Sequence, residues 1–164
     1  MPRKPKLRII VDTNCWISFL IGRKLSCLVD LLSNERVQLI LCPDLLEEIR
    51  EVTSRPKFAK YFPQDEVASL IEFMQIIGEE FTPKSQVQLC RDKADDYLLA
   101  LAIDAKADYL VTGDQDLLIL KQIEKCKIVD VKTFELSPLV KLESLSLNSS
   151  SLFPDQRNDP PCKL

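Results

Sequence analysis

The sequence predicts an α/β fold, a three-layer α/β/α arrangement with a central parallel sheet of about five strands. Short apolar segments rich in β-branched residues alternate with longer segments of helical apolar spacing, a pattern typical of parallel sheets covered by helices on both faces. The 164 residues, 46% of them hydrophobic, are enough for one domain with an ordinary core. We expect a flexible basic N-terminus over 1–6, a folded domain over 7–142 and a disordered tail over 143–164, which is rich in Ser, Asn, Asp and Pro.

Five short segments have the composition of strands. They lie at 7–11, 37–42, 80–82, 109–112 and 127–131. The first, Leu-Arg-Ile-Ile-Val, is an apolar run of mostly β-branched residues that ends directly at Asp12. Because helical segments separate the strands, consecutive strands are expected to pair in parallel.

Six segments have the apolar spacing of helices. They lie at 14–33, 44–55, 64–77, 92–105, 115–123 and 132–140. Gly22 is expected to interrupt the first of them. Pro43 is a favourable residue at a helix start, and Pro56 disfavours the helical conformation of the residue before it, so the second helix should end near Arg55.

The composition excludes several classes of chemistry. The chain has no histidine, which rules out Ser-His-Asp and Cys-His catalysis and histidine-bound metals. The six cysteines are scattered without a CxxC pair and are expected to be reduced. With a net charge of −3, the protein would need local basic patches to bind nucleic acid. No apolar run is long enough to cross a membrane, and we expect a cytoplasmic protein.

Two predicted strands are followed by aspartates at the same edge of the sheet. Asp12 directly follows the first strand, and Asp114 follows the fourth. Ligands of open α/β sheets bind beyond the carboxyl ends of the strands, so both carboxylates would face one crevice. The alternative for each is an ordinary helix N-cap, because an aspartate that opens a helix often has only that role.

Two helical acids complete a candidate cluster. At about 100° per residue, Glu48 lies at the border of the apolar face of its helix, where it can lean into the crevice. In the helix over 92–105, Asp92 can serve as the cap and Asp95 as a favourable first-turn acid. Asp96 is left on a surface that is apolar nearly all round, and a buried carboxylate needs a partner. A bound cation is the economical partner, and clustered carboxylates without histidine suit Mg²⁺ or Mn²⁺.

With these residues placed, the chain resembles PIN-domain proteins, which include toxin ribonucleases of VapC type. The resemblance covers about 7–140. Four motifs carry it: Val-Asp-Thr-Asn at 11–14, Leu-x-Glu-Ile at 46–49 with Arg-Pro-Lys-Phe at 55–58, Asp-Asp-Tyr-Leu-Leu-Ala at 95–100, and Ala-Asp-Tyr-Leu-Val-Thr-Gly-Asp-x-Asp-Leu-Leu at 107–118. The Arg-Pro-Lys-Phe segment most resembles a branch described as toxin components, which is less well understood than the VapC toxins.

The resemblance implies a parallel sheet, an acidic Mg²⁺ or Mn²⁺ site and endonucleolytic RNA cleavage that leaves a 5′-phosphate. The acids at the matching positions are Asp12, Glu48, Asp96 and Asp114, with Asp116 as an auxiliary metal ligand. Asn14 or Thr112 would orient a carboxylate. The resemblance also implies a homodimer and, for a toxin, an antitoxin protein that occludes the site; no membrane contact is expected.

Possible RNA contacts form two basic groups along the predicted crevice rim. They are Arg23 and Lys24, and Arg55, Lys57 and Lys60. Ordinary solvated surface charges are an equal alternative for both groups. Trp16, one turn into the first helix, is expected in the core rather than as a base-stacking platform.

Two other functions compete with the nuclease. A non-catalytic PIN scaffold that binds RNA or protein would tolerate loss of the acids, yet all four are present. A phosphatase of the haloacid-dehalogenase type also places an aspartate after the first strand, but it needs a second aspartate two residues later, where this chain has Asn14.

Overall fold

The computed structural model describes residues 5–22, 30, 32, 34–135 and 137. They form a six-stranded sheet of order β3-β2-β1-β4-β6-β5. The strands are β1 (Leu7–Val11), β2 (Val37–Leu41), β3 (Gly78–Glu80), β4 (Tyr109–Val111), β5 (Gln122–Ile123) and β6 (Cys126–Val129). All pairings are parallel except that of β5 with β6. The predicted α/β class with a mainly parallel sheet is therefore confirmed.

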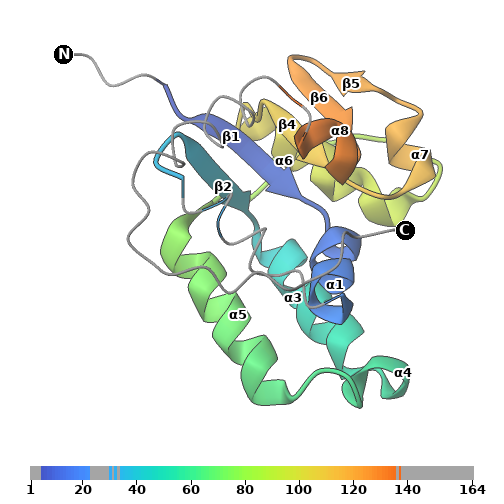
Figure 1. The fold of residues 1–164 in the computed structure, drawn as a ribbon. Helices are drawn as coiled ribbons and strands as arrows, with labels where there is room; N and C mark the ends of the chain where they lie inside the picture. Colours follow the sequence, from blue (N-terminus) through green and yellow to red (C-terminus); the bar gives the residue numbers. More distant parts are fainter. Residues whose placement is uncertain (1–4, 23–29, 31, 33, 136, 138–164) are drawn as a thin grey trace.

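Helices connect the parallel strands. They are α1 (Thr13–Ile21), α3 (Pro43–Ser54), α4 (Pro56–Ala59), α5 (Gln64–Ile77), η1 (Lys93–Asp95, a 3₁₀ turn), α6 (Asp96–Asp104), α7 (Gln115–Leu118) and α8 (Val131–Glu135). Figure 1 shows α1 and α3 leaving from the arrow ends of β1 and β2, so both helices begin at the carboxyl edge of the sheet. Helix α3 packs against α1 and α5.

The centre of the sheet is fully apolar. Ile9 and Ile10 on β1 and Leu110 on β4 are inaccessible to solvent. Trp16 is also inaccessible, and its indole N–H donates to the carbonyl of Val11 at 3.0 Å. Its predicted place in the core is thus confirmed, and its hydrogen bond ties α1 to the end of β1, directly before the first candidate acid.

The largest difference from the prediction lies after β4. The helix expected over 115–123 ends at Leu118, and the chain turns into β5, which pairs antiparallel with β6. Lys121 and Glu124 adopt positive φ values of 61° and 48°, and such left-handed residues end the helix and turn the hairpin. A helix pattern in the sequence does not reveal these two local reversals.

The third strand begins two residues earlier than expected. The prediction over 80–82 relied on Phe81, but β3 covers Gly78–Glu80 and follows α5 without a loop. The Phe81 ring instead lies 5.1 Å from the guanidinium of Arg8 on β1. The backbone N–H of Phe81 still donates to the carbonyl of Leu41 on β2 at 2.8 Å, so hydrogen bonding between the two segments continues past the end of β3, and the ring packs against the core.

The described cysteines agree with the prediction of reduced thiols. Cys15, Cys42, Cys90 and Cys126 are buried and free; positions 27 and 162 lie outside the described residues, as does the predicted tail over 143–164. Within the described part of the chain, no helix has both the length and the apolar character needed to cross a membrane.

Candidate metal centre

The sheet register places Asp12 beside Thr112. Val11 on β1 pairs with Val111 on β4, so the residue after each strand reaches the same edge. Both side chains are buried, and the Thr112 hydroxyl donates to Oδ2 of Asp12 at 2.7 Å. The same hydroxyl accepts the backbone N–H of Asp114 at 3.0 Å. Thr112 thus orients the Asp12 carboxylate, the role predicted for it, and links it to the start of α7.

Glu48 reaches the same edge from the middle of α3. Its Oε2 accepts a hydrogen bond from the Thr13 hydroxyl at 2.9 Å and another from the Tyr97 hydroxyl. Burial raises the pKa of Asp12, and the negative charge of Glu48 raises it further, while the hydrogen bond from Thr112 opposes the shift. Glu48 and Asp12 therefore interact, as the helix phase predicted. Burial and the bond to Glu48 also raise the pKa of Tyr97, so its hydroxyl keeps its proton.

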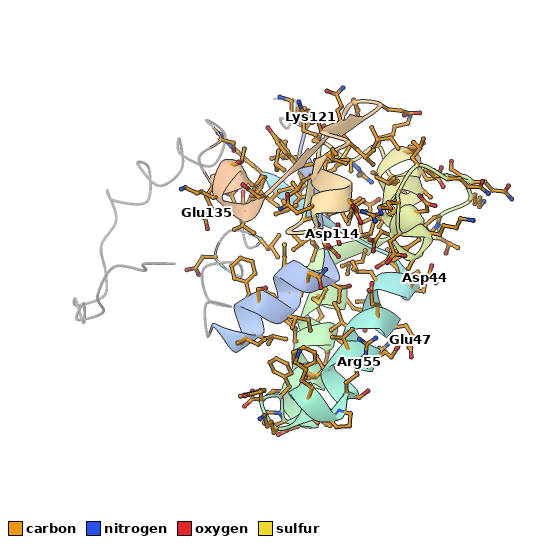
Figure 2. All side chains as sticks on the ribbon, turned by 90° about the vertical axis from the view of Figure 1, so that its right-hand side faces the viewer. Asp44, Glu47, Arg55, Asp114, Lys121 and Glu135 are labelled. Atoms are coloured by element: carbon orange, nitrogen blue, oxygen red, sulfur yellow. The ribbon has the colours of Figure 1, made fainter. Side chains whose placement is uncertain are left out.

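Asp114 caps the start of α7 with one of its two carboxylate oxygens. Its Oδ1 accepts the N–H groups of Asp116 at 2.7 Å and of Leu117 at 3.4 Å, so the N-cap alternative holds for this residue. Its second oxygen is not used by the cap. Figure 2 shows Asp114 and the first turns of α3, marked by Asp44 and Glu47, on the same side of the molecule.

Asp95 belongs to the cluster electrostatically. Burial raises its pKa to about 6, and the next largest causes are the charges of Asp12 and Asp114, followed by Asp92 and Glu48. A carboxylate that is repelled by acids from β1, α7 and α3 lies where the three elements converge. No ion pair between described residues involves Asp12, Glu48, Asp95 or Asp114.

At Asp96 the structure differs from the prediction. The Asp96 carboxylate is buried, as expected, but its Oδ1 accepts the backbone N–H groups of Leu89 at 3.1 Å and of Cys90 at 2.9 Å. These two hydrogen bonds satisfy one of its two oxygens and fasten the segment before η1. A 3₁₀ turn covers Lys93–Asp95 and α6 begins only at Asp96, so a helical phase counted from Asp92 does not hold for these acids. Asp92 does cap this turn, as predicted.

Asn14 was predicted to orient a carboxylate, and Asp116 was predicted as an auxiliary metal ligand. The backbone N–H of Asn14 is among the groups that oppose the pKa shift of Asp12, while the residue itself is exposed. Asp116 lies in the first turn of α7, and its backbone N–H donates to the Asp114 cap. The structure therefore does not bring the side chains of Asn14 and Asp116 into the hydrogen-bonded cluster.

The donor set fits a hard divalent cation. The cluster offers only oxygen donors; burial and then the like charges around them raise the pKa of Asp12 and of Asp95, and no described basic side chain forms an ion pair with the cluster. As the side chains stand, no three acidic or thiol groups in the described ranges are close enough to surround one ion. The fit to a cation is therefore one of donor type and charge.

The second basic group surrounds α4. Arg55, the residue after the end of α3, forms an exposed ion pair with Glu51 at 3.1 Å, and Figure 2 shows it beyond Glu47 on the side away from Asp44. The amino group of Lys60 lies 4.8 Å from the ring centre of Tyr61, which is 59% exposed. Lys57 makes a similar contact with Phe58 at 5.4 Å. The sequence pattern does not single out Tyr61, although its exposed ring lies among these cations. Positions 23 and 24, the first predicted basic group, lie outside the described residues.

Each of three comparisons with known proteins found a match. A family model described as PIN domain matches residues 8–116. The uncharacterized protein MJ1680 of Methanocaldococcus jannaschii is 28% identical over 125 residues, which are 74% of this chain and 80% of that protein. Among solved structures, the PIN domain of RRP44 from T. brucei has a TM-score of 0.44 and 16% identity, covering 87% of this chain and 86% of that one.

Proposed function

Because the chain belongs to the PIN domain family, whose fold is that of nucleases, we propose that it is a Mg²⁺- or Mn²⁺-dependent endoribonuclease. The acids proposed to hold the cation are Asp12, Glu48, Asp95 and Asp114. The observation that carries the proposal is their mutual repulsion at the carboxyl edge of the sheet. Such a cluster disfavours the metal-free fold at neutral pH, so a cation that binds it should stabilise the protein.

The protein's own residues supply orientation. Thr112 fixes the Asp12 carboxylate from the neighbouring strand, and the cap of α7 fixes one oxygen of Asp114. When bound, a divalent cation supplies positive charge that activates water and neutralises charge developing on a phosphodiester. Asp12 follows the end of β1, Glu48 is in the middle of α3 and Asp114 caps α7, so these three acids are held by regular elements, which precise positioning of a scissile phosphate requires.

RNA cleavage with and without metal is the direct test. We expect the purified protein to cut single-stranded or structured RNA in Mn²⁺ or Mg²⁺ and to be inactive in EDTA. Asp44→Asn is the matched control for asparagine substitutions in the cluster, such as Asp12→Asn. Asp44 is an exposed acid in the first turn of α3 outside the cluster, so its substitution should leave the rate within about twofold of the original.

Two outcomes would favour the competing functions. Unchanged RNA binding without cleavage in Mn²⁺ supports a non-catalytic scaffold, and hydrolysis of small phosphomonoesters supports a phosphatase. Cleavage of RNA that is abolished by EDTA excludes both as the main activity.

The surface around α4 is the proposed path of the RNA. Arg55 directly follows α3, the helix that carries Glu48, and α4 with Lys57 packs against α3. The cations after Glu48 could therefore contact phosphates next to the cleaved bond, and Tyr61 could stack on an unpaired base.

Removing two of these cations should weaken substrate binding rather than catalysis. The double variant Lys57→Ala/Lys60→Ala is expected to raise KM for RNA by about tenfold and to leave kcat within about twofold, since phosphate contacts position the substrate. The slope of log affinity against log salt should fall by about 1.4 for two lost contacts with a single strand. Steady-state kinetics and a salt titration measure both quantities.

A control for this variant exists at the opposite edge of the sheet. Lys6 precedes β1 and Lys125 precedes β6, so both exposed lysines lie at the amino ends of strands. Lys6→Ala/Lys125→Ala removes the same charge and should leave KM unchanged. Equal KM increases in the two double variants would show that only net charge matters and would remove the assignment of the α4 surface.

The toxin role and the partners stay predictions from the resemblance. An antitoxin would be detected as a protein that binds this chain and blocks RNA cleavage, and a homodimer by the mass of the protein in solution. Growth arrest on expression, relieved by the Asp12→Asn substitution, would support a toxin that acts through this site.

A further inference from the structure

We propose that Tyr97 and Thr13 are positioning residues that hold Glu48 with one carboxylate oxygen turned toward a divalent cation. The inference rests on the proposed metal-dependent function and goes beyond it, because neither residue is among the acids of the site. Three elements meet in this contact: Thr13 opens α1, Glu48 is in the middle of α3, and Tyr97 is in the first turn of α6.

The two hydroxyl groups act on the same atom. Thr13 Oγ1 donates to Oε2 of Glu48 at 2.9 Å, and Tyr97 Oη donates to that same oxygen. The other oxygen, Oε1, accepts no hydrogen bond from any described residue, and it is not among the fully buried polar atoms without a partner. The carboxylate is therefore held from one side and open on the other.

This arrangement matters because glutamate is flexible. An unrestrained glutamate loses rotamer freedom when it binds an ion, and two hydroxyl donors impose that restriction before the ion arrives. Thr13 is 2% exposed, so its hydroxyl has a fixed environment. Groups that orient metal-binding side chains in this way commonly change metal affinity by 10-fold to 100-fold when removed.

The Asp12 carboxylate is held in a comparable way. Thr112 donates to one oxygen of Asp12, Oδ2, from a neighbouring element. Two acids of the cluster thus each use one oxygen for hydroxyl groups of the chain. The pattern suits a centre in which each held carboxylate offers its remaining oxygen to one ion.

The test measures Mn²⁺ binding to the full-length protein without RNA, by calorimetry or by the electron paramagnetic resonance signal of free Mn²⁺. Tyr97→Phe removes the hydroxyl and keeps the ring, and it should raise Kd for Mn²⁺ by about tenfold. Thr13→Val should have a similar effect, whereas Thr13→Ser keeps the hydroxyl and should bind Mn²⁺ like the original protein. At saturating Mn²⁺, kcat should recover in Tyr97→Phe, with KM for RNA unchanged.

Tyr109→Phe is the matched control, since Tyr109 lies at the start of β4 with its ring against Phe134 at 5.3 Å, and it should leave Mn²⁺ affinity unchanged. A merely structural role would lower the unfolding temperature of Tyr97→Phe without changing Kd for Mn²⁺, and that result would overturn the proposal. If Tyr97→Phe does not fold, equal Mn²⁺ affinities of Thr13→Val and Thr13→Ser overturn it instead. Absence of Mn²⁺ binding by the original protein would refute the metal site itself, a different result from a refuted positioning role.

Discussion

Replacing Asp12 with asparagine is expected to lower kcat for RNA cleavage by roughly 10³-fold at saturating Mn²⁺. Asp12 is the most buried acid of the cluster, 3% exposed, and it lies at the end of the central strand. Asparagine has the same shape and can still accept the hydrogen bond from Thr112, so the fold is preserved while the negative charge is lost. The loss corresponds to about 4 kcal/mol of transition-state stabilisation.

The stability of Asp12→Asn should change in the opposite direction. Burial and Glu48 raise the pKa of Asp12, which means that the fold disfavours its charged form. The neutral variant should therefore unfold at a higher temperature than the original protein in EDTA. Added Mn²⁺ should raise the unfolding temperature of the original protein and leave that of the variant nearly unchanged. Kinetics near the original rate in this variant would exclude Asp12 from the site.

Asp95 and Asp96 are expected to give opposite results although they are neighbours in the sequence. Asp95→Asn should lower kcat by about 10²-fold, because it removes a carboxylate coupled to Asp12 and Asp114. Asp96→Asn should retain activity and stability, since asparagine keeps an oxygen for the amides of Leu89 and Cys90. Asp96→Ala should lower the free energy of unfolding by about 1–3 kcal/mol, because both amides lose their acceptor.

The Asp95 variant also has a defined pH dependence. In the fold the Asp95 carboxyl has a pKa of about 6, above its ordinary value of 3.8, so its contribution to stability is fully present below pH 3.8 and is lost as pH rises through 6. In EDTA, Asp95→Asn should be more stable than the original protein by about 1 kcal/mol at pH 8, allowing for solvent screening of a partly exposed group. The difference should vanish near pH 4. Urea unfolding at the two pH values measures it, and a loss of activity in Asp96→Asn with none in Asp95→Asn would reverse the assignment.

Local signals in the sequence were sufficient for most of the sheet. The strand β1 and the helix α5 have the predicted bounds, because a β-branched run ending at an acid and an apolar stripe flanked by Pro63 and Gly78 are unambiguous. The position of Glu48 was also predictable, since α3 is a regular helix and its phase can be counted from its apolar residues. Regular geometry is what makes such counting valid.

The errors lie where the backbone departs from regular geometry. The helix expected from Asp92 is a 3₁₀ turn up to Asp95 followed by α6, so the directions of the Asp95 and Asp96 side chains could not be counted from a single helical phase. The hairpin of β5 and β6 depends on two residues with left-handed backbone conformation, Lys121 and Glu124, neither of which is a glycine. The contact of Tyr97 with Glu48 spans 49 positions and joins two helices, so no local pattern reports it.

The order of the strands has a consequence for synthesis of the protein. β1 is made early, but its second neighbour is β4, and Asp12 obtains its hydrogen bond from Thr112, 100 positions later. At about 5–20 residues per second, a ribosome needs roughly 5–20 s to make the chain between them. A nascent chain without β4 has neither the Thr112 hydroxyl nor the Asp114 carboxylate. Each nascent chain therefore lacks part of the proposed site until β4 and the residues after it have been made, because the strand that pairs with β1 on this side comes late in the sequence.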